Sequence, residues 1–456
     1  REHRTDMRTT IWDQYRSKLR TADEAAKLVK SGDWVNYSQF GMTPVRLDEA
    51  LARRVGELTD VKVSTSSSMY PVQVAVRDPQ QKSFTYHSTF LSSHDRALHR
   101  KGLCFFTPSN FHEQPSRYRN GYYPRPNVAM ITTTTMDKNG FFNFGPGCTY
   151  MGAVVEMADK VIVEVNEAVP LCLGGYEENI HISKVDCIVE TEARPLITIE
   201  KPEPTEEDKK IAELLIDEIP NGACLQLGIG GVPNAVGSLI AESDLKDFGV
   251  HSEMMCDAYL DLYQKGKING RNKYTNRNKM VYTFSMGSQK LYEFLDNNPA
   301  CAIFPVDYTN SLENVARNDN VISINNALQI DLFGQTASEA IGGKQISGSG
   351  GQGDFVIGAT KSNGGKAFIC LHSTRMVKGE RMSCIVPDVQ GIVSIPRANA
   401  FYVVTEFGKV NLKGKTSWQI AEALISIAHP DFQEGLIKCA QEKGLWRNRS
   451  LGKGAA

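Results

Sequence analysis

The sequence lacks both a hydrophobic run long enough to cross a membrane and an excess of basic residues. It has 456 residues, with 51 Lys and Arg against 52 Asp and Glu, so its formal net charge is −1. Its apolar runs, such as residues 160–165, are short and strand-like, whereas a membrane helix needs about 20 apolar residues. Nucleic-acid-binding surfaces need clustered basic residues, and here the two signs are interspersed. We therefore expect no membrane and no nucleic-acid partner.

Cysteine and histidine patterns that indicate metal or disulfide chemistry are also missing. The ten Cys are scattered without a C-x-x-C pair, and the nine His form neither H-x-x-x-H nor H-E-x-x-H. These absences argue against a zinc ribbon, a redox dithiol and a disulfide scaffold, so we expect reduced cysteines, no metal and a cytoplasmic location. Residues 1–6 lack the apolar core of a secretory signal and an initiator Met, which leaves open whether residues precede Arg1.

Short β-branched runs alternate with helical patterns along the chain. Runs at residues 161–165, 367–370 and 401–405 are typical of buried strands, and residues 47–54 and 235–241 have a helical pattern. This alternation favours an α/β fold with mainly parallel sheets, because parallel strands are covered on both faces and read as continuous apolar runs.

The second half of the chain repeats the first weakly, at an offset of about 190 residues. Segments at 33–44, 89–93, 103–108 and 127–131 resemble, in the same order, segments at 223–233, 283–287, 300–305 and 320–324. A polar, proline-bearing stretch separates the halves, followed by a helical pattern from about 209 to 219. We predict two tandem, similar, open α/β domains, residues 1–200 and 209–456, joined by a linker at 201–208.

One carboxylate, Glu253, stands in a mostly apolar segment at residues 250–257. A buried acid is costly unless it is partnered or used. The counterpart segment of the first half, residues 61–67, has hydroxyl side chains and no acid. Two similar halves with one acid indicate a single asymmetric site at their junction. The alternative is a structural carboxylate at a strand end.

Two glycine-rich segments accompany this acid. Residues 228–232 follow an expected strand and precede a helix with Pro233 in its first turn. Their N–H groups could therefore hold an oxyanion or a phosphate. The alternative is a simple tight turn between the strand and the helix. Residues 347–353 contain G-x-G-x-x-G, but no acidic residue follows at the distance that a dinucleotide site requires. We interpret this second segment as a wall where the backbone approaches a ligand closely.

Several long strings resemble the family I CoA-transferases, in particular the bacterial butyryl-CoA:acetate and 4-hydroxybutyrate CoA-transferases. The matching strings are residues 161–166, 174–175, 180–183, 225–231, 251–254, 345–352 and 412–415. The resemblance implies that Glu253 is the nucleophile and that Lys378 lies in a loop that meets CoA. It also implies that both glycine segments bind CoA and stabilise an oxyanion, through Gly228, Ile229, Gly230, Gly231, Val232, Gly350 and Gly351.

These observations lead to one expected function and two alternatives. We expect CoA transfer between a short-chain acyl-CoA and a carboxylic acid such as acetate, through a covalent glutamyl-CoA thioester, in a homodimer or larger homo-oligomer. CoA is then a substrate, and no cofactor is tightly bound. Gln39, Met69 and Tyr70 are candidates for the acyl pocket, against ordinary core packing. The alternatives are a short-chain acyl-CoA hydrolase on the same scaffold and a non-catalytic sensor of CoA or a sugar phosphate.

Overall fold

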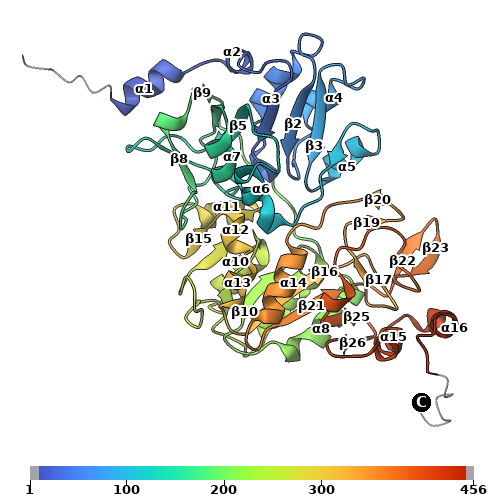
Figure 1. Ribbon diagram of the computed structural model, residues 1–456. Coiled ribbons are helices and arrows are strands. Elements are labelled where there is room, and N and C mark those ends of the chain that lie inside the picture. Colours follow the sequence, from blue (N-terminus) through green and yellow to red (C-terminus); the bar gives the residue numbers. More distant parts are fainter. Residues whose placement is uncertain (1–9, 448–456) are drawn as a thin grey trace, which may run out of the picture. The chain divides into compact units, whose positions relative to one another are not determined.

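The computed structural model describes residues 10–447 and divides them into two compact units (Figure 1). Unit 1 comprises residues 10–107, 113–198 and 283–307, and unit 2 comprises residues 108–112, 199–282 and 308–447. The first residues of the chain, on which the expectation about a secretory signal rests, lie outside the described part. Neither unit is one continuous stretch of sequence.

Unit 1 contains a seven-stranded sheet, which is parallel between every pair of neighbours. In spatial order its strands are β4 (Phe105–Phe106), β3 (Phe84–Ser88), β2 (Val61–Thr65), β1 (Trp34–Tyr37), β5 (Val128–Thr133), β7 (Lys160–Val165) and β9 (Cys187–Glu190). β6 (Phe141–Asn143) and β8 (Asn179–His181) form a separate antiparallel pair. The strand expected at residues 161–165 is therefore confirmed as β7.

One face of this sheet packs on helices through an apolar core. Side chains of alternate strand residues, such as Val35 and Val63, contact Leu47, Leu51 and Val74 on the helices. The helices of unit 1 are α1 (Ile11–Lys18), α2 (Ala22–Ala26), α3 (Val45–Ala52), α4 (Gln73–Val76), α5 (Ser93–His99), α6 (Gln114–Arg119), α7 (Met151–Met157) and α11 (Gln289–Leu295). The helix expected at 47–54 is α3, two residues earlier in the chain.

Unit 2 contains a six-stranded sheet in which only the last pair is antiparallel. In spatial order its strands are β11 (Gly249–Val250), β10 (Cys224–Leu227), β16 (Val321–Asn326), β21 (Lys366–Cys370), β25 (Tyr402–Thr405) and β26 (Gly408–Asn411). The strands expected at 367–370 and 401–405 are confirmed as β21 and β25. The short strands and hairpins include β12 (Met254–Met255), β13 (Met280–Tyr282), β17 (Gln329–Asp331), β20 (Lys344–Gln345), β22 (Thr374–Val377), β23 (Glu380–Ser383) and β24 (Ile385–Val386).

Helix α14 (Gln352–Lys361) covers one face of this sheet, where it lies against β16 and β21 (Figure 1). Its Phe355 and Val356 pack with Val321, Ala367 and Ile369. The remaining helices of unit 2 are α8 (Glu206–Leu215), α9 (Gly231–Glu242), α10 (Asp257–Gln264), α13 (Leu312–Ala316), α15 (Ser417–Ser426) and α16 (Pro430–Glu442). The helix expected from 209 begins at Glu206, because the Thr205 side chain caps it and Asp208 returns the bond.

The sheet order confirms the internal repeat. The sequence β2-β1-β5-β7-β9 in unit 1 corresponds to β11-β10-β16-β21-β25 in unit 2, with parallel pairing throughout. Val35 pairs with Val63 in the first sheet and Leu225 pairs with Val250 in the second. The prediction of two similar open α/β domains with mainly parallel sheets is correct.

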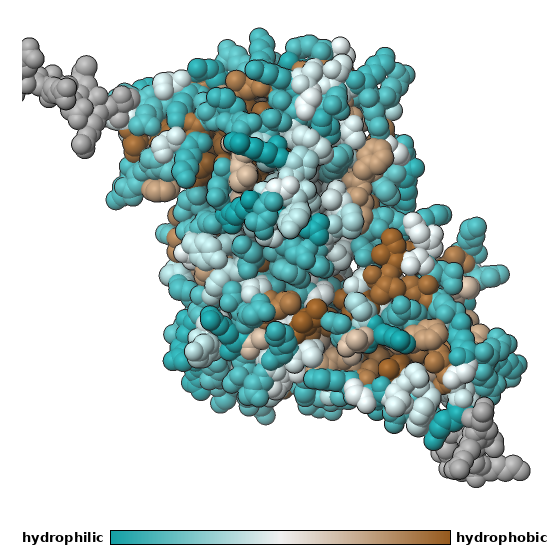
Figure 2. Space-filling model, in the orientation of Figure 1, coloured by the Kyte–Doolittle hydropathy of each residue, from teal (hydrophilic) through white to brown (hydrophobic). Residues whose placement is uncertain are grey.

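Most of the face drawn in Figure 2 is hydrophilic, with hydrophobic residues in scattered patches on both units. Within residues 10–447, no helix is long and apolar enough to cross a membrane. The exposed large hydrophobic side chains in unit 2 include Met376 and Met382 on the β22–β23 hairpin.

Candidate active site

The carboxyl ends of the parallel strands of unit 2 bring the predicted site segments together. β10 ends at Leu227 and leads into the first glycine segment, while β11 ends at Val250 and leads to Glu253. Ligands in open α/β sheets bind at this edge, because the loops and helix N-termini converge there. Glu253 itself lies in a bend between β11 and β12, and not on a strand.

A buried histidine ties the segment before this bend to residue 309. His251 is fully buried, and its Nε2 donates to the Thr309 carbonyl at 2.7 Å. Burial lowers the pKa of His251 to about 3, with a further decrease from the charge of Lys273. The ring is therefore neutral, and it positions Glu253 relative to residues 309–310 without taking part in proton transfer.

A buried tyrosine connects the bend with the first glycine segment. The Tyr259 hydroxyl, on α10, donates to Ser252 Oγ at 2.9 Å and accepts from the Leu227 N–H at 2.6 Å. Ser252 Oγ in turn donates to the Met254 carbonyl at 3.0 Å. This network joins the residue before Glu253 to the residue before Gly228, so the acid and the glycine loop are held in a fixed relationship.

The Glu253 side chain is partly exposed, and its carboxylate meets an amide. Asn310 Nδ2 donates to Glu253 Oε2 at 2.7 Å and to Asp354 Oδ2 at 3.1 Å. The pKa of Glu253 is raised to about 7: desolvation is the main cause, the Asn310 hydrogen bond opposes it, and the nearby charge of Asp354 adds to it. A carboxylate with this pKa is a better base and nucleophile than an exposed one, and much of it is still ionised near neutral pH.

The second glycine segment touches the Glu253 carboxylate. A Cβ atom on Gly351 would lie 1.9 Å from Glu253 Oε2 and 2.4 Å from Asn310 Nδ2, so only glycine fits there. Gly350 has φ +52°, a conformation that glycine adopts readily. Within the described residues, the N–H groups of Gly350 and Gly351 donate no hydrogen bond. They are open donors beside the carboxylate, which is what stabilisation of an oxyanion requires.

The first glycine segment needs its residue types for similar reasons. The Gly228 N–H extends the sheet by donating to the Ile324 carbonyl at 2.9 Å, whereas the Ile229 and Gly230 amides have no acceptor among residues 10–447. Gly230 has φ +131°, and a Cβ on Gly231 would lie 1.9 Å from Asp208 Oδ2. The open amides of Ile229 and Gly230 lie at the start of α9, whose N-terminus favours negative charge.

A pocket of about 370 Å³ opens beside this segment. Gly231 and Val232 line it together with Asn326, His372 and Arg375. Arg375 offers a cation that a phosphate could pair with, on the same side as the helix N-terminus. The pocket therefore suits an anionic ligand that extends from the glycine loop.

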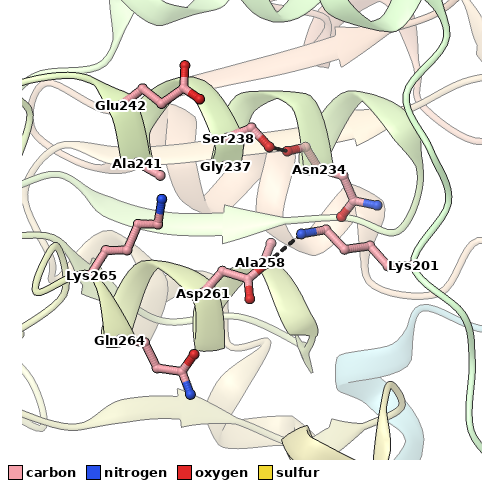
Figure 3. A pocket seen from close by; sticks show the side chains of 10 residues that line it. All are labelled: Lys201, Asn234, Gly237, Ser238, Ala241, Glu242, Ala258, Asp261, Gln264 and Lys265. Atoms are coloured by element: carbon pink, nitrogen blue, oxygen red, sulfur yellow. Dashed lines mark hydrogen bonds and ion pairs between the residues drawn. The ribbon is translucent and has the colours of Figure 1, made fainter.

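A second pocket, of about 210 Å³, lies between α9 and α10 and contains none of the predicted site residues (Figure 3). Lys201 and Lys265 line it, together with Glu242 and Asp261. Lys201 Nζ is 2.5 Å from Asp261 Oδ2. Both pockets contain an acid that is already bonded, Asp261 here and Asp208 to His372 in the first, but the first also has Arg375 and adjoins the open amides of the glycine segment.

Lys378 occupies the turn of the exposed β22–β23 hairpin, with φ +50°. Among the described residues its side chain makes no hydrogen bond and no ion pair. The structure thus leaves the lysine accessible to a ligand but brings it into contact with neither Glu253 nor a glycine segment.

Gln39 follows β1, and Met69 and Tyr70 follow β2, all in unit 1. The Met69 N–H donates to the Phe40 carbonyl at 3.1 Å, and the Gln39 amide is buried against Thr149. The Tyr70 ring lies 5.8 Å from the Arg194 guanidinium carbon. Met69 thus bonds to the residue that follows Gln39, and the role of the three residues stays a prediction.

Sequence reasoning missed three residues of the site: Asn310, Asp354 and His112. Asp354 carried a signal, because it stands three residues after Gly351 at the start of a helical pattern, where an acid is favoured. Asn310 and His112 carried none, since they lie 57 residues after and 141 residues before Glu253. Within residues 10–447, no group of three or more His, Cys, Asp or Glu is arranged to hold a metal ion.

The chain belongs to the acetyl-CoA hydrolase/transferase family: the family's N-terminal domain matches residues 3–200 and its C-terminal domain matches residues 287–440.

Individual relatives cover nearly the whole chain. A butyryl-CoA:acetate CoA-transferase of Anaerostipes caccae is 50% identical over 439 residues, which is 95% of this chain and 98% of that one. A probable butyrate:acetyl-CoA coenzyme A-transferase of Syntrophomonas wolfei is 49% identical over 444 residues, 97% and 99% of the two chains. The crystal structure of RipA from Yersinia pestis is 37% identical, with a TM-score of 0.89 over 95% of this chain and 99% of that one.

Proposed function

We propose that this protein transfers CoA between a short-chain acyl-CoA, such as butyryl-CoA, and acetate. The names of the relatives at 49–50% identity support the two substrates. The observation that carries the chemistry is Glu253, a carboxylate with a pKa of about 7 that touches Gly351 between open backbone amides. A thioester and a free acid can exchange partners through such a group without hydrolysis.

In the first half-reaction, Glu253 attacks the acyl-CoA carbonyl, and the C–S bond breaks to give a mixed glutamyl–acyl anhydride and the CoA thiolate. The thiolate then attacks the glutamyl carbonyl, which forms a glutamyl-CoA thioester and releases the acyl group as its carboxylate. In the second half, acetate attacks this thioester to give an anhydride, and the thiolate attacks the acetyl carbonyl. Acetyl-CoA leaves and Glu253 is regenerated, with no net proton transfer.

Each of these steps passes through a tetrahedral oxyanion. Asn310 Nδ2 already donates to the Glu253 carboxylate, and Gly351, whose N–H is open, lies against it; these groups and the open Gly350 amide are the donors that we assign to the oxyanion. Such prearranged donors stabilise a developing negative charge without reorganising. A second acid in direct contact with Glu253 would be unfavourable, because its negative charge would oppose the negative charge that these donors stabilise.

CoA binds along the first glycine segment. The open amides of Ile229 and Gly230 and the N-terminus of α9 favour its negatively charged part, and the adjoining pocket of about 370 Å³ provides Arg375. Lys378, on its accessible hairpin, adds a second cation. Binding energy from this remote part of CoA assists the chemical step at Glu253.

Gln39, Met69 and Tyr70 select the acyl group. All three lie in unit 1, after the carboxyl ends of neighbouring strands, with Gln39 buried and the other two partly exposed. We further propose that the enzyme acts in the cytoplasm as a homodimer or larger homo-oligomer.

One assay separates the transferase from its alternatives. Incubation with butyryl-CoA and acetate should give acetyl-CoA and butyrate in equal amounts, and omission of acetate should reduce CoA turnover by at least tenfold. Equal butyryl-CoA loss with and without acetate would identify a hydrolase. Tight binding of butyryl-CoA without turnover, in the presence of acetate, propionate and hydroxybutyrate in turn, would identify a sensor.

A further inference from the structure

A single amide group in unit 2 is shared between two carboxylates. Asn310 is fully buried, and its Nδ2 donates to both Glu253 Oε2 and Asp354 Oδ2. The two hydrogens of an NH₂ group allow both bonds at once. Its Oδ1 has no hydrogen-bond partner among the described residues, so the carbonyl side does not fix the amide. The orientation of the group that holds Glu253 therefore depends on Asp354.

Asp354 is itself held firmly. Its side chain is only 2% exposed, and it lies in the first turn of α14, where the helix N-terminus stabilises a negative charge. Asp354 Oδ1 bonds to His112 Nδ1, and Asp354 Oδ2 accepts from the His112 backbone N–H at 3.2 Å. The side chain and the backbone of one residue thus restrain both oxygens of this carboxylate.

His112 belongs to a short segment with a particular position in the chain. Pro108–His112 packs in unit 2, although the residues on both sides of it belong to unit 1. Its Phe111 N–H donates to the Gly350 carbonyl at 3.0 Å, and Ser349 Oγ donates to its Ser109 carbonyl at 2.8 Å. Three residues of this segment therefore contact the second glycine segment and the turn of α14 that follows it.

We propose that Asp354 and His112 are positioning residues, which fix the Asn310 amide against Glu253 and so orient the nucleophile. This inference rests on the proposed function of Glu253. Neither residue needs to touch the substrate, because both act through Asn310. The geometry explains why a five-residue segment from the first half of the chain packs beside the glycine wall: it supplies the imidazole that restrains Asp354.

The charges of this arrangement have a second effect. The groups that act on Glu253 are the neutral amide of Asn310, which lowers its pKa, and the carboxylate of Asp354, which raises it. Removing one or the other should therefore move the pKa of Glu253 in opposite directions. These shifts report the charge and the hydrogen bond at Glu253, whereas the rate at saturating acyl-CoA reports its orientation.

The test measures the rate of glutamyl-CoA thioester formation in single turnover, as a function of pH, together with KM for acyl-CoA. We expect His112→Ala to lower this rate about ten- to a hundredfold, because small misplacements of reacting groups cost this much, with KM changed by less than twofold. His112→Asn places an amide donor near the former Nδ1 and should recover most of the loss. Asp354→Asn should move the acidic limb of the profile to lower pH, and Asn310→Leu should move it to higher pH.

The control is His99→Ala in unit 1, whose half-buried ring bonds to the Cys104 carbonyl at 2.7 Å; this variant should react like the wild type. Thermal unfolding of each variant separates misfolding from mispositioning. If the wild type forms the thioester and His112→Ala and Asp354→Asn match it in rate and pH profile, the inference is wrong. It is also wrong if the rate falls only in proportion to lost folded protein. If the wild type forms no thioester, the proposed function itself fails.

Discussion

Gly351 and Glu253 approach each other so closely that no side chain fits between them: a Cβ atom on residue 351 would lie 1.9 Å from Glu253 Oε2. The glycine segment at 347–353 is thus a wall against which the reacting carboxylate rests. A larger residue at position 351 would displace the carboxylate from this segment, whose Gly350 and Gly351 amides donate no hydrogen bond within the described residues. This contact accounts for the glycine at position 351.

Gly351→Ala should lower the rate of thioester formation by about a hundredfold or more, because the carboxylate must move away from its donors. The matched control is Gly353→Ala, two residues further on, where a Cβ would meet only Ile395 Cδ1 at an ordinary 3.8 Å. Single-turnover kinetics with butyryl-CoA compare the two variants. Similar rates in both would show that the close contact is unimportant.

The rate of thioester formation should depend on pH through Glu253. Burial raises the pKa of this carboxyl to about 7, and only the ionised form attacks. The rate should therefore fall about tenfold per pH unit below pH 7 and level off above it. Stopped-flow measurements between pH 5.5 and 8.5 test this. A rate that stays constant down to pH 5.5 would mean that the nucleophile is an ordinary exposed carboxylate or a different group.

The raised pKa of Glu253 also has a cost in stability. Because the folded state binds the proton more tightly than the unfolded state, whose pKa is near 4.5, the wild type loses stability as pH rises from 4.5 through 7. Glu253→Gln carries no charge, so it should be more stable than the wild type at pH 8, by about 1 kcal/mol for this partly exposed group, and by less at pH 5.5. Urea unfolding of both proteins at the two pH values measures the difference. A variant less stable than the wild type at pH 8 would contradict the desolvation of Glu253.

Lys378→Ala should raise KM for acyl-CoA about three- to tenfold and leave kcat within twofold, since an exposed cation contributes mainly to attraction of the charged part of CoA. The effect should shrink as salt is added. Lys438→Ala on α16, whose lysine pairs with Glu434 at 3.2 Å, is the control. An equal change in KM for acyl-CoA in both variants would show that Lys378 does not belong to the CoA site.

The architecture could be predicted from the sequence because the patterns that mark its strands are local and occur in both halves of the chain. Apolar runs marked β7, β21 and β25, and the repeat between residues 127–131 and 320–324 marks the equivalent strands β5 and β16. Even the contrast at Glu253 has a structural basis. Val63 and Val250 occupy equivalent positions in the two sheets, because each pairs with the equivalent residue of the neighbouring strand. Three residues further along the chain, Ser66 in the first repeat is therefore the equivalent of Glu253 in the second.

The exchange of segments between the units had no such signal. Residues 283–307 pack in unit 1 and residues 108–112 in unit 2, although both lie inside the other unit's stretch of sequence. Such long-range packing depends on which surfaces fit, and spacing along the chain does not show it. For the same reason Asn310 and His112 could not be assigned to the site from the sequence, whereas Glu253 and the glycine segments could.

The central claim is that Glu253 becomes covalently attached to CoA, and one measurement tests it directly. The wild type is incubated with butyryl-CoA in the absence of acetate, digested at mildly acidic pH and analysed by mass spectrometry, in parallel with Glu253→Gln. We expect CoA on the peptide that contains Glu253 in the wild type, its loss on addition of acetate with formation of acetyl-CoA, and no adduct in the variant. An adduct on another residue, or full transferase activity in Glu253→Gln, would contradict the claim.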